Sequence, residues 1–272
     1  MSYRPKLIAT DLDGTICPHA APISHRTIET LTRAHDLGVK VFFVTGRPPR
    51  WMGQIKEAFN FGHTICSNGG ILWDLQQEKV LEEWRISPAD MRETVIRLRR
   101  AIPEIHFAFE NHGDFRREIK YVARWDLGVD ITGVDDILDH TENGAVKLLA
   151  RGSDKLFDSD EMLEVAKREV SDIVTVTHSN PWESLLEISA HGVSKGDTLS
   201  IICERLQIDR EDVVAFGDNP NDFSMLEFAG RSYAMLDGHP DGIKYATASA
   251  PPCEEDGVAQ IVEELLNLPV RN

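Results

Sequence analysis

Two aspartates stand two positions apart in the segment DLDGT at residues 11–15, directly after a short apolar run. In an extended segment, side chains two positions apart lie on the same face. The carboxylates of Asp11 and Asp13 therefore repel each other unless a cation or a proton lies between them. Gly14 allows the chain to turn sharply behind them. The pair predicts a site where two carboxylates share a cation or a proton, and an acidic turn or helix cap is the alternative.

Two further segments carry groups that bind anions. Thr45, Gly46 and Arg47 follow a second apolar run, and a hydroxyl with free backbone N–H groups at a strand-to-helix turn can hold an anion. Lys195, in GVSKGD, stands near the expected start of a helix. The helix dipole disfavours a cation there, so a phosphate or carboxylate partner is expected. The alternatives are an ordinary Thr-Gly turn and a solvated surface lysine.

The segment GDNPND at residues 217–222 adds Asp218, Asn221 and Asp222 at the end of another apolar run. These side chains offer oxygen ligands, and no His or Cys is adjacent, so the set suits Mg²⁺ best. Taken alone, the segment is also typical of an Asx-rich turn. Four such segments, each after an expected strand or at the start of an expected helix, together indicate one site.

The elements that must position these segments are strands that end at a common edge. Apolar runs followed by polar turns predict buried strands at Lys6–Thr10, Val39–Val44, His63–Ser67 and Val213–Phe216. Helices are expected to begin after Ser24, at Pro48 or Pro49, and at Ser194, and to cover Phe223–Ala229 and Val258–Leu266. This alternation predicts an α/β fold with a doubly wound, Rossmann-like parallel sheet, whose site lies at the carboxyl ends of the strands.

Residues 84–189 have a different pattern. Helices beginning at Ser87-Pro88 and covering Asp160–Val170 accompany four expected strands, at Ile105–Phe109, Val146–Ala150, Ile173–Thr177 and Leu185–Ile188. This order is α+β and not a repeated strand–helix–strand unit. We therefore expect a core formed by residues 1–83 and 190–272, with residues 84–189 inserted into it as an α+β cap domain.

The composition excludes several classes of protein. The 272 residues include 29 Lys and Arg against 45 Asp and Glu, a net charge of −16. Nucleic-acid binders and membrane-surface proteins use basic clusters, so neither partner is expected, and a phosphorylated substrate would need a locally positive site. The apolar runs are far shorter than the ~20 residues that span a bilayer. The four cysteines are widely spaced and no secretion signal is evident, which favours a cytoplasmic protein. The sequence leaves the oligomeric state open between a monomer and a small homo-oligomer.

At these residues the chain resembles the haloacid dehalogenase superfamily of phosphohydrolases, and within it the Cof-like sugar-phosphatase branch with a large α/β cap. The motifs are DLDGT, VTGR, SNGG, LEISAHGVSKGD, and VVAFGDNPND followed by DFSMLEFAG. The resemblance implies that Asp11 is the nucleophile that forms an aspartyl-phosphate. It implies that Asp13 protonates the leaving alkoxide and then activates water. Mg²⁺ would be held by Asp11, the backbone carbonyl of Asp13, and Asp218.

The resemblance also implies that five groups of the chain bind the phosphoryl oxygens. They are the backbone N–H groups of Leu12 and Gly46 and the side chains of Thr45, Lys195 and Asn221. Asp222 would orient Lys195 or a metal-bound water. Arg47 either contacts substrate or is an exposed or cap-docking arginine, and Asn68 of SNGG either faces substrate or is a structural turn residue. Relatives often have a G-N-A turn where this chain has LDGHP at 236–240. Asp237 then stands in place of the Asn of that turn, and the resemblance leaves open which contacts it makes on the cap side.

The function implied is a Mg²⁺-dependent phosphatase that hydrolyses a small phosphorylated metabolite, foremost a sugar phosphate. A phosphomutase would use the same aspartyl-phosphate and transfer it to a second sugar hydroxyl instead of water. A non-catalytic sensor of a phosphorylated ligand is a third possibility, although such proteins normally lose one or more of the four residues Asp11, Asp13, Lys195 and Asp218, all of which are present.

Overall fold

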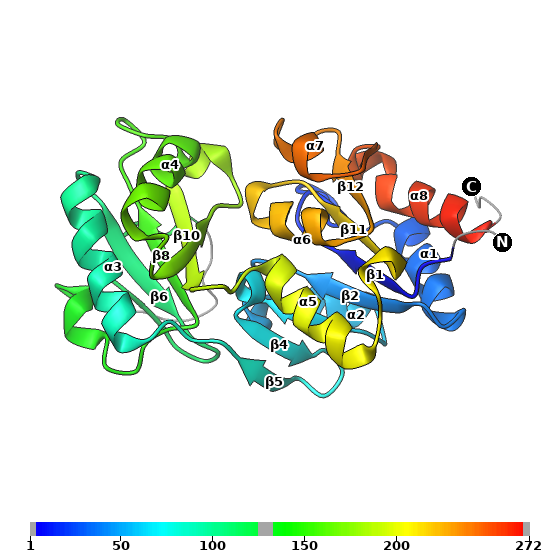
Figure 1. The fold of residues 1–272 in the computed structure, drawn as a ribbon, viewed down its shortest axis with the longest axis horizontal. Helices are drawn as coiled ribbons and strands as arrows, with labels where there is room; N and C mark the ends of the chain where they lie inside the picture. The colour runs from blue at the N-terminus through cyan, green and yellow to red at the C-terminus, as the bar shows by residue number, and fades with distance from the viewer. Residues whose placement is uncertain (1–3, 125–132, 269–272) are drawn as a thin grey trace. The chain divides into compact units, whose positions relative to one another are not determined.

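The structure is a computed structural model that describes residues 4–124 and 133–268 (Figure 1). The chain divides into two compact units. The core unit contains the residues up to Arg47, Met52–Leu81, and the residues from Ser194 onward. The insert unit contains Pro48–Trp51 and Glu82–Val193. None of the helices in the described part of the chain has the length and apolar character needed to cross a membrane.

The core unit is built on an eight-stranded sheet with the order β13-β12-β11-β1-β2-β3-β4-β5. All the strands from β13 to β3 are parallel, which is the doubly wound sheet that the sequence predicts. The bounds of the strands are β1 Leu7–Thr10, β2 Lys40–Val44, β3 His63–Cys66, β4 Ile71–Asp74, β5 Lys79–Glu83, β11 Val213–Gly217, β12 Arg231–Met235 and β13 Ala248–Ala250.

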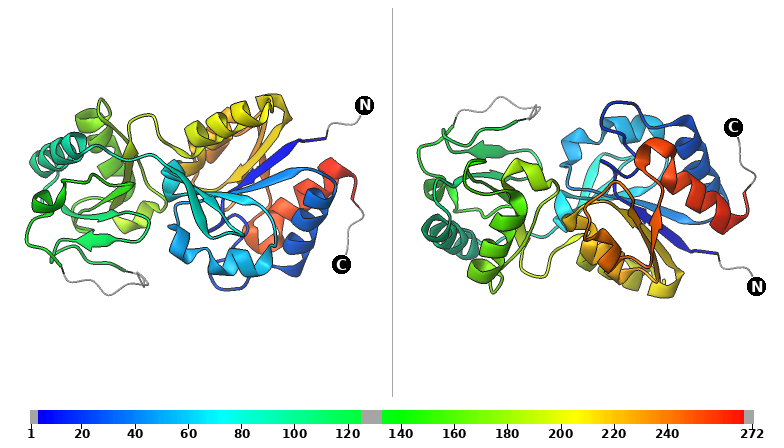
Figure 2. Two further views of the ribbon diagram at one scale, coloured as in Figure 1. Left: turned by 90° about the horizontal axis from the view of Figure 1, so that it is seen from below. Right: turned by 90° about the horizontal axis from the view of Figure 1, so that it is seen from above.

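Helices cover both faces of this sheet. Figure 2 shows α5 on one face and α1 and α8 on the opposite face. The helices begin where the sequence supplies a cap: the Ser24 hydroxyl accepts the Thr27 N–H (3.0 Å) and the Ser194 hydroxyl accepts the Asp197 N–H (3.1 Å). The helices of the core unit are α1 His25–Asp36, α2 Gly53–Ala58, α5 Lys195–Leu206, α6 Phe223–Phe228, α7 Gly242–Tyr245 and α8 Gly257–Leu266.

The structure adds β12 and β13, with the short helix α7 between them, to the expected elements of the core unit, and it differs from the sequence prediction in two further respects. The helix expected from Pro48 or Pro49 is broken: a short 3₁₀ turn covers Pro49–Trp51, the chain leaves helical geometry at Met52, and α2 begins at Gly53. The 3₁₀ turn belongs to the insert unit, where Arg50 pairs with Glu110, whereas Met52 is buried in the core unit. The second difference is the edge formed by β4 and β5. The strand β4 is antiparallel to β3, because the turn after β3 reverses the chain directly.

The insert unit is a five-stranded sheet with two helices on one face. The strand order is β7-β6-β8-β10-β9, and the observed pairings are antiparallel. The apolar side chains of one face pack against the helices, for example Phe107 and Leu148 against Val95 and Met162. The elements are α3 Pro88–Ala101, β6 His106–Glu110, β7 Phe115–Arg117, β8 Lys147–Arg151, α4 Ser159–Val170, β9 Val174–Thr177 and β10 Leu185–Ala190.

Candidate active site

The carboxyl ends of neighbouring parallel strands bring the sequence-predicted residues together. Asp11 follows β1, Thr45 follows β2 and Asp218 follows β11, and β1 lies between the other two strands. The Asp11 N–H donates to the carbonyl of Phe216 at 3.0 Å, which fixes the two strand ends against each other. Lys195 is the first residue of α5. The carboxyl edge of the sheet, where the site is expected, is therefore lined by groups from four separate parts of the chain.

Lys195 is completely buried and lies between two carboxylates. Its Nζ donates to Asp11 Oδ1 at 2.7 Å and to Asp222 Oδ1 at 2.6 Å. Burial by itself lowers the pKa of this lysine, but the two carboxylates raise it well above its ordinary value, so the side chain stays charged. A fully buried ammonium group is stable only when it is paired in this way. The first residue of α5 is thus a cation at a helix N-terminus, a position that the helix dipole disfavours, and two carboxylates compensate for it.

Asp222 uses both of its oxygens to organise the site. While Oδ1 accepts from Lys195, Oδ2 accepts the backbone N–H groups of Asp218 and Asn219, each at 3.0 Å. These contacts fix the turn after β11 and hold the Lys195 ammonium in place. Asp222 therefore lies where a residue that orients Lys195 must lie.

Three buried carboxylates converge on this point. Asp11, Asp218 and Asp222 each offer an oxygen within 4.8 Å of the others. Burial, followed by the charge of Asp222, raises the pKa of Asp11 to about 7. Burial, followed by the charges of Asp11 and Asp222, raises the pKa of Asp218 well above its ordinary value. Lys195 neutralises one of three negative charges, so the donor set fits a hard divalent cation.

Asp11 and Asp13 have different surroundings, although they stand two residues apart. The strand ends at Thr10, and the chain turns back through bonds from the N–H groups of residues 15, 16 and 17 to the carbonyl of Leu12. As a result Asp11 is buried, whereas the side chain of Asp13 is 51% exposed. The guanidinium of Arg47 holds the Asp13 carboxylate by two hydrogen bonds, one of them from Nε to Oδ2 at 2.8 Å. Two carboxylates in such different environments are suited to two different roles.

Asp218 is positioned by residues that sequence reasoning did not assign to the site. The Thr15 hydroxyl donates to Asp218 Oδ1 at 3.2 Å, and the Asn219 side-chain amide donates to Asp218 Oδ2 at 2.5 Å. Gly14 has a φ of +79°, and a Cβ at that position would lie 2.4 Å from Asp218 Oδ2. The signals were present in the sequence, since Gly14 and Thr15 complete DLDGT and Asn219 lies within GDNPND.

The turn that follows β3 joins the Thr45 turn at the same edge. The Asn68 N–H donates to the Thr45 carbonyl at 3.0 Å, and the Asn221 side-chain amide donates to Asn68 Oδ1 at 3.1 Å. Ser67 and Asn68 both adopt left-handed backbone conformations, with φ of 52° and 55°, which non-glycine residues adopt mainly where surrounding contacts hold them. The Thr45 hydroxyl accepts the Arg47 N–H at 3.0 Å, and Gly46 lies in the same turn. Asn68 thus belongs to the site, and the motif SNGG was its signal.

Comparison with known proteins identifies the family. The model of the haloacid dehalogenase-like hydrolases matches residues 8–262, which is nearly the whole chain. The chain belongs to this family. Membership in the haloacid dehalogenase-like hydrolases generally implies a divalent metal, and the Asp11–Asp218–Asp222 cluster is an acidic group able to hold one.

Two curated relatives of this haloacid dehalogenase-like hydrolase are named phosphatases. It is 28% identical over 286 residues to the 5-amino-6-(5-phospho-D-ribitylamino)uracil phosphatase YitU of Bacillus subtilis, covering 98% of this chain and 100% of that protein. It is 27% identical over 272 residues to the pyridoxal phosphate phosphatase YbhA of Escherichia coli, covering 94% of this chain and 97% of the relative. The haloacid dehalogenase-like hydrolase described here is accordingly a phosphoric monoester hydrolase.

A solved structure has a similar fold. The subclass IIB sugar phosphatase BT4131 of the haloacid dehalogenase superfamily superimposes with a TM-score of 0.79 at 21% identity, covering 97% of this chain and 100% of that one. This likeness supports the Rossmann-like core with a cap, which is the fold class that the sequence predicts.

Proposed function

We propose that this chain is a Mg²⁺-dependent phosphatase that hydrolyses a small phosphorylated metabolite, foremost a sugar phosphate, through an aspartyl-phosphate on Asp11. The observation that carries the proposal is the buried Lys195 ammonium, whose Nζ lies 2.7 Å from Asp11 and 2.6 Å from Asp222, beside a third buried carboxylate. The phosphorylated small molecules in the names of the two relatives support the substrate class.

Asp11 is the nucleophile in this proposal. Its carboxylate would attack phosphorus as the bond to the leaving oxygen breaks, and water would then hydrolyse the acyl phosphate. The Lys195 bond to Oδ1 orients the carboxylate before substrate arrives, so little reorganisation is needed in the reaction. The groups that would hold Mg²⁺ are Asp11, Asp218 and the backbone carbonyl of Asp13. When bound, the ion would offset the charge of the carboxylates and of the phosphate.

Asp13 is the acid and base. It would protonate the leaving alkoxide in the first step and accept a proton from the attacking water in the second. The two hydrogen bonds from Arg47 hold the half-exposed Asp13 carboxylate in one orientation. Because they occupy both of its oxygens, one of them must break before Asp13 can carry the proton. We therefore propose that Arg47 acts through Asp13. This positioning role stands beside the substrate contact that the resemblance allows.

The transferring phosphoryl group would be held by the donors around the same edge. These are the backbone N–H groups of Leu12 and Gly46, the Thr45 hydroxyl, the Lys195 ammonium and the Asn221 amide. The hydrogen bonds that link the Thr45 turn to Asn68, and Asn68 to Asn221, hold two of these donors in fixed relative positions. Fixed donors stabilise the charge that spreads over the equatorial oxygens in the transition state.

The test is release of inorganic phosphate from a panel of sugar phosphates, pyridoxal phosphate, nucleotides and other small phosphoesters, with and without Mg²⁺. We expect Mg²⁺-dependent turnover of a few panel members by the wild-type protein and none by Asp11→Asn. Asp212→Asn is the matched control, because Asp212 pairs with the exposed Lys6 just before the start of β11, at the opposite end of that strand from Asp218.

Three outcomes would overturn the proposal. Turnover by a folded Asp11→Asn variant at the wild-type rate would exclude Asp11 as the nucleophile. Transfer of the phosphoryl group to a second hydroxyl without phosphate release would indicate a phosphomutase. Tight binding of a phosphorylated panel member without any turnover would indicate a sensor.

A further inference from the structure

The turn between β3 and β4 has an unusual backbone. Ser67, Asn68 and Gly69 have φ of 52°, 55° and 106°, so three successive residues of the turn are left-handed. The Ser67 hydroxyl is buried without a hydrogen-bond partner among the described residues. Left-handed non-glycine residues and unsatisfied buried groups both cost free energy, and they persist at functional sites where surrounding contacts hold them. What this turn contacts in the core unit therefore bears on function.

Two sides of the turn hold segments that carry phosphoryl-binding groups of the proposed function. The Asn68 N–H donates to the Thr45 carbonyl at 3.0 Å, and Asn68 Oδ1 accepts the Asn221 side-chain amide at 3.1 Å. All three residues are more than nine-tenths buried, so water competes little for these bonds. Asn68 thus links the turn after β2 to the turn after β11.

The third side of the turn packs against the first turn of α5, which carries Lys195. The buried Thr198 hydroxyl donates to the Gly69 carbonyl at 2.9 Å. A Cβ at Gly69 would lie 2.6 Å from the carbonyl carbon of Ser194 and 2.9 Å from Thr198 Oγ1, so glycine is needed for this close approach. Ser194 caps α5 and directly precedes Lys195. The turn therefore contacts the helix one residue away from the buried lysine.

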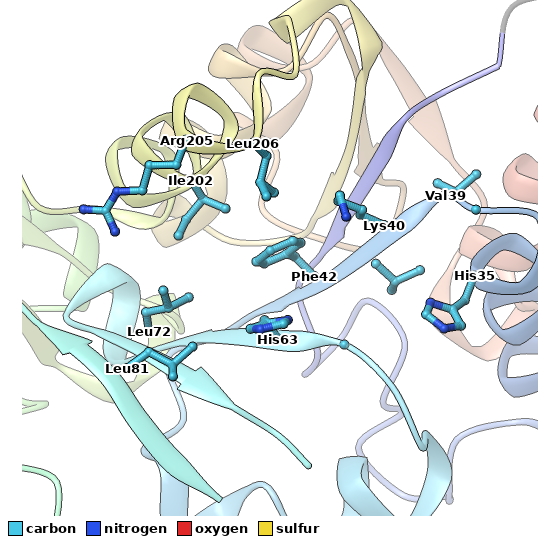
Figure 3. A pocket seen from close by; sticks show the side chains of 13 residues that line it. His35, Val39, Lys40, Phe42, His63, Leu72, Leu81, Ile202, Arg205 and Leu206 are labelled. Carbon is cyan, nitrogen blue, oxygen red and sulfur yellow. The ribbon is translucent and has the colours of Figure 1, made fainter. Parts of the chain in front are cut away.

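The opposite end of α5 is held less firmly by the sheet. A pocket of about 500 Å³ lies beside its C-terminal turn, and its lining includes Ile202 and Leu206 of the helix with Phe42 and Leu72 of the sheet (Figure 3). Parallel strands need crossover connections, usually helices, which cover the faces of a sheet. Short turns join β3 to β4 and β4 to β5 instead, and within the described residues they leave this edge of the sheet bare beside α5. Because side chains do not fill this space, the position of Lys195 depends on the contacts at the N-terminal end of the helix.

We propose that Asn68, Gly69 and Thr198 are positioning residues of the phosphoryl transfer, a role that rests on the proposed function. Together they fix three segments relative to one another: the turn after β2, the start of α5 and the turn after β11. In the transition state, charge spreads over the equatorial phosphoryl oxygens, and donors that are already in place stabilise it best. A displaced donor therefore costs more in the transition state than in the complex with substrate.

The test begins with the bond that joins the turn to α5. Thr198→Val removes the hydroxyl and nearly keeps the shape of the side chain, whereas Thr198→Ser keeps the hydroxyl. With Mg²⁺ and the best substrate of the panel, we expect kcat to fall about 3- to 10-fold in the Val variant and to stay within about twofold of wild type in the Ser variant.

Inhibition by orthovanadate, a five-coordinate mimic of the transition state, separates positioning from stability. In Thr198→Val the Ki for orthovanadate should rise by the same factor by which kcat falls, while the Ki for inorganic phosphate stays within about twofold of wild type. A smaller folded fraction would lower kcat without changing either Ki.

Two substitutions in the turn test the other contacts. Asn68→Gly removes the acceptor of the Asn221 amide but keeps the left-handed backbone, and it should change kcat and the Ki for orthovanadate as Thr198→Val does. Gly69→Ala places a Cβ against Ser194 and should lower kcat at least about tenfold. Gly38→Ala is its matched control and should keep the wild-type kcat. Gly38 is also left-handed, with φ of 87°, has open space where a Cβ would lie, and precedes β2, at the other end of that strand from the site.

Thermal unfolding of each variant establishes that it is folded at the temperature of the assay. Wild-type kcat and wild-type Ki for orthovanadate in folded Thr198→Val and Asn68→Gly would overturn the proposal. An equal loss of kcat in Thr198→Ser, or in Gly38→Ala, would overturn it too, because the hydroxyl or the place of the glycine would then be irrelevant. A lower kcat with an unchanged Ki for orthovanadate would show a structural role only. In all these cases the wild-type protein still releases phosphate and the proposed function stands, whereas a wild-type protein without turnover would refute the proposed function and this role with it.

Discussion

Replacing Asp222 by Asn tests whether this residue acts by holding Lys195. Asp222 accepts three hydrogen bonds, one from Lys195 at 2.6 Å and two from backbone N–H groups at 3.0 Å. An Asn side chain can satisfy the two backbone groups with its oxygen, but its NH₂ group then faces the Lys195 ammonium. The variant therefore loses one buried, charge-assisted hydrogen bond, while Lys195 keeps its bond to Asp11.

The size of the effect follows from that single lost contact. A hydrogen bond to a charged group contributes about 1.5–3 kcal/mol, and each 1.36 kcal/mol corresponds to a tenfold change in rate. If the contact acts in the transition state, kcat should fall by about 10- to 150-fold while KM changes little. The assay is steady-state phosphate release from the best panel substrate, with Asp212→Asn as the control.

A double-mutant cycle then separates positioning of Lys195 from a general structural effect. Lys195→Met removes the partner, so adding Asp222→Asn to it should lower kcat by much less than Asp222→Asn does in the wild-type background. Wild-type kcat in a folded Asp222→Asn variant would refute the reasoning. Full additivity of the two substitutions would refute it as well, because Asp222 would then act without Lys195.

Three further predictions concern the backbone of the site, the metal and the scaffold. Gly14→Ala should destabilise the protein by more than about 1 kcal/mol and lower kcat, because φ is +79° and the new Cβ would lie 2.4 Å from Asp218 Oδ2. Urea unfolding measures the loss of stability and phosphate release measures the loss of kcat. If neither quantity changes, the geometric argument is wrong. Chelation of divalent ions with EDTA should abolish turnover, and Mg²⁺ should restore it; full activity in dialysed, chelator-treated protein would contradict a metal-dependent mechanism. Glu263→Gln should cost about 1 kcal/mol at pH 7, because Arg26 and Thr30 donate to this nearly buried carboxylate and tie α8 to α1. The hydrogen bond from Arg26 lowers the pKa of Glu263 below its ordinary value of 4.5, so this stability is present above that pH and is lost as the pH falls through the lowered value. Urea unfolding of wild type and variant from pH 7 to pH 3 measures this, and a difference that persists undiminished at the acid end would refute it.

The sequence by itself determined the features that depend on near neighbours along the chain. Continuous apolar runs ending in polar turns located β1, β2, β3 and β11, because a strand buried on both faces needs apolar side chains at successive positions. Ser24 and Ser194 located the starts of α1 and α5, since a cap bonds to an N–H group three residues away. The order of the motifs, together with the rule that sites lie at the carboxyl ends of parallel strands, predicted which residues would meet.

Only the tertiary structure decided how side chains far apart in the sequence pair with one another. Thr15 bonds to Asp218 across 203 positions and Asn221 bonds to Asn68 across 153, while Arg47 turns to Asp13. None of these pairings is encoded in a local pattern, because each depends on which loops the packed strands bring together. The bare sheet edge beside α5 has the same origin: it follows from the hairpin connections of β4 and β5, which replace the crossover helices that the predicted alternation requires. Local patterns fix the elements, whereas the packing of distant segments fixes the contacts that give the site its charge and geometry.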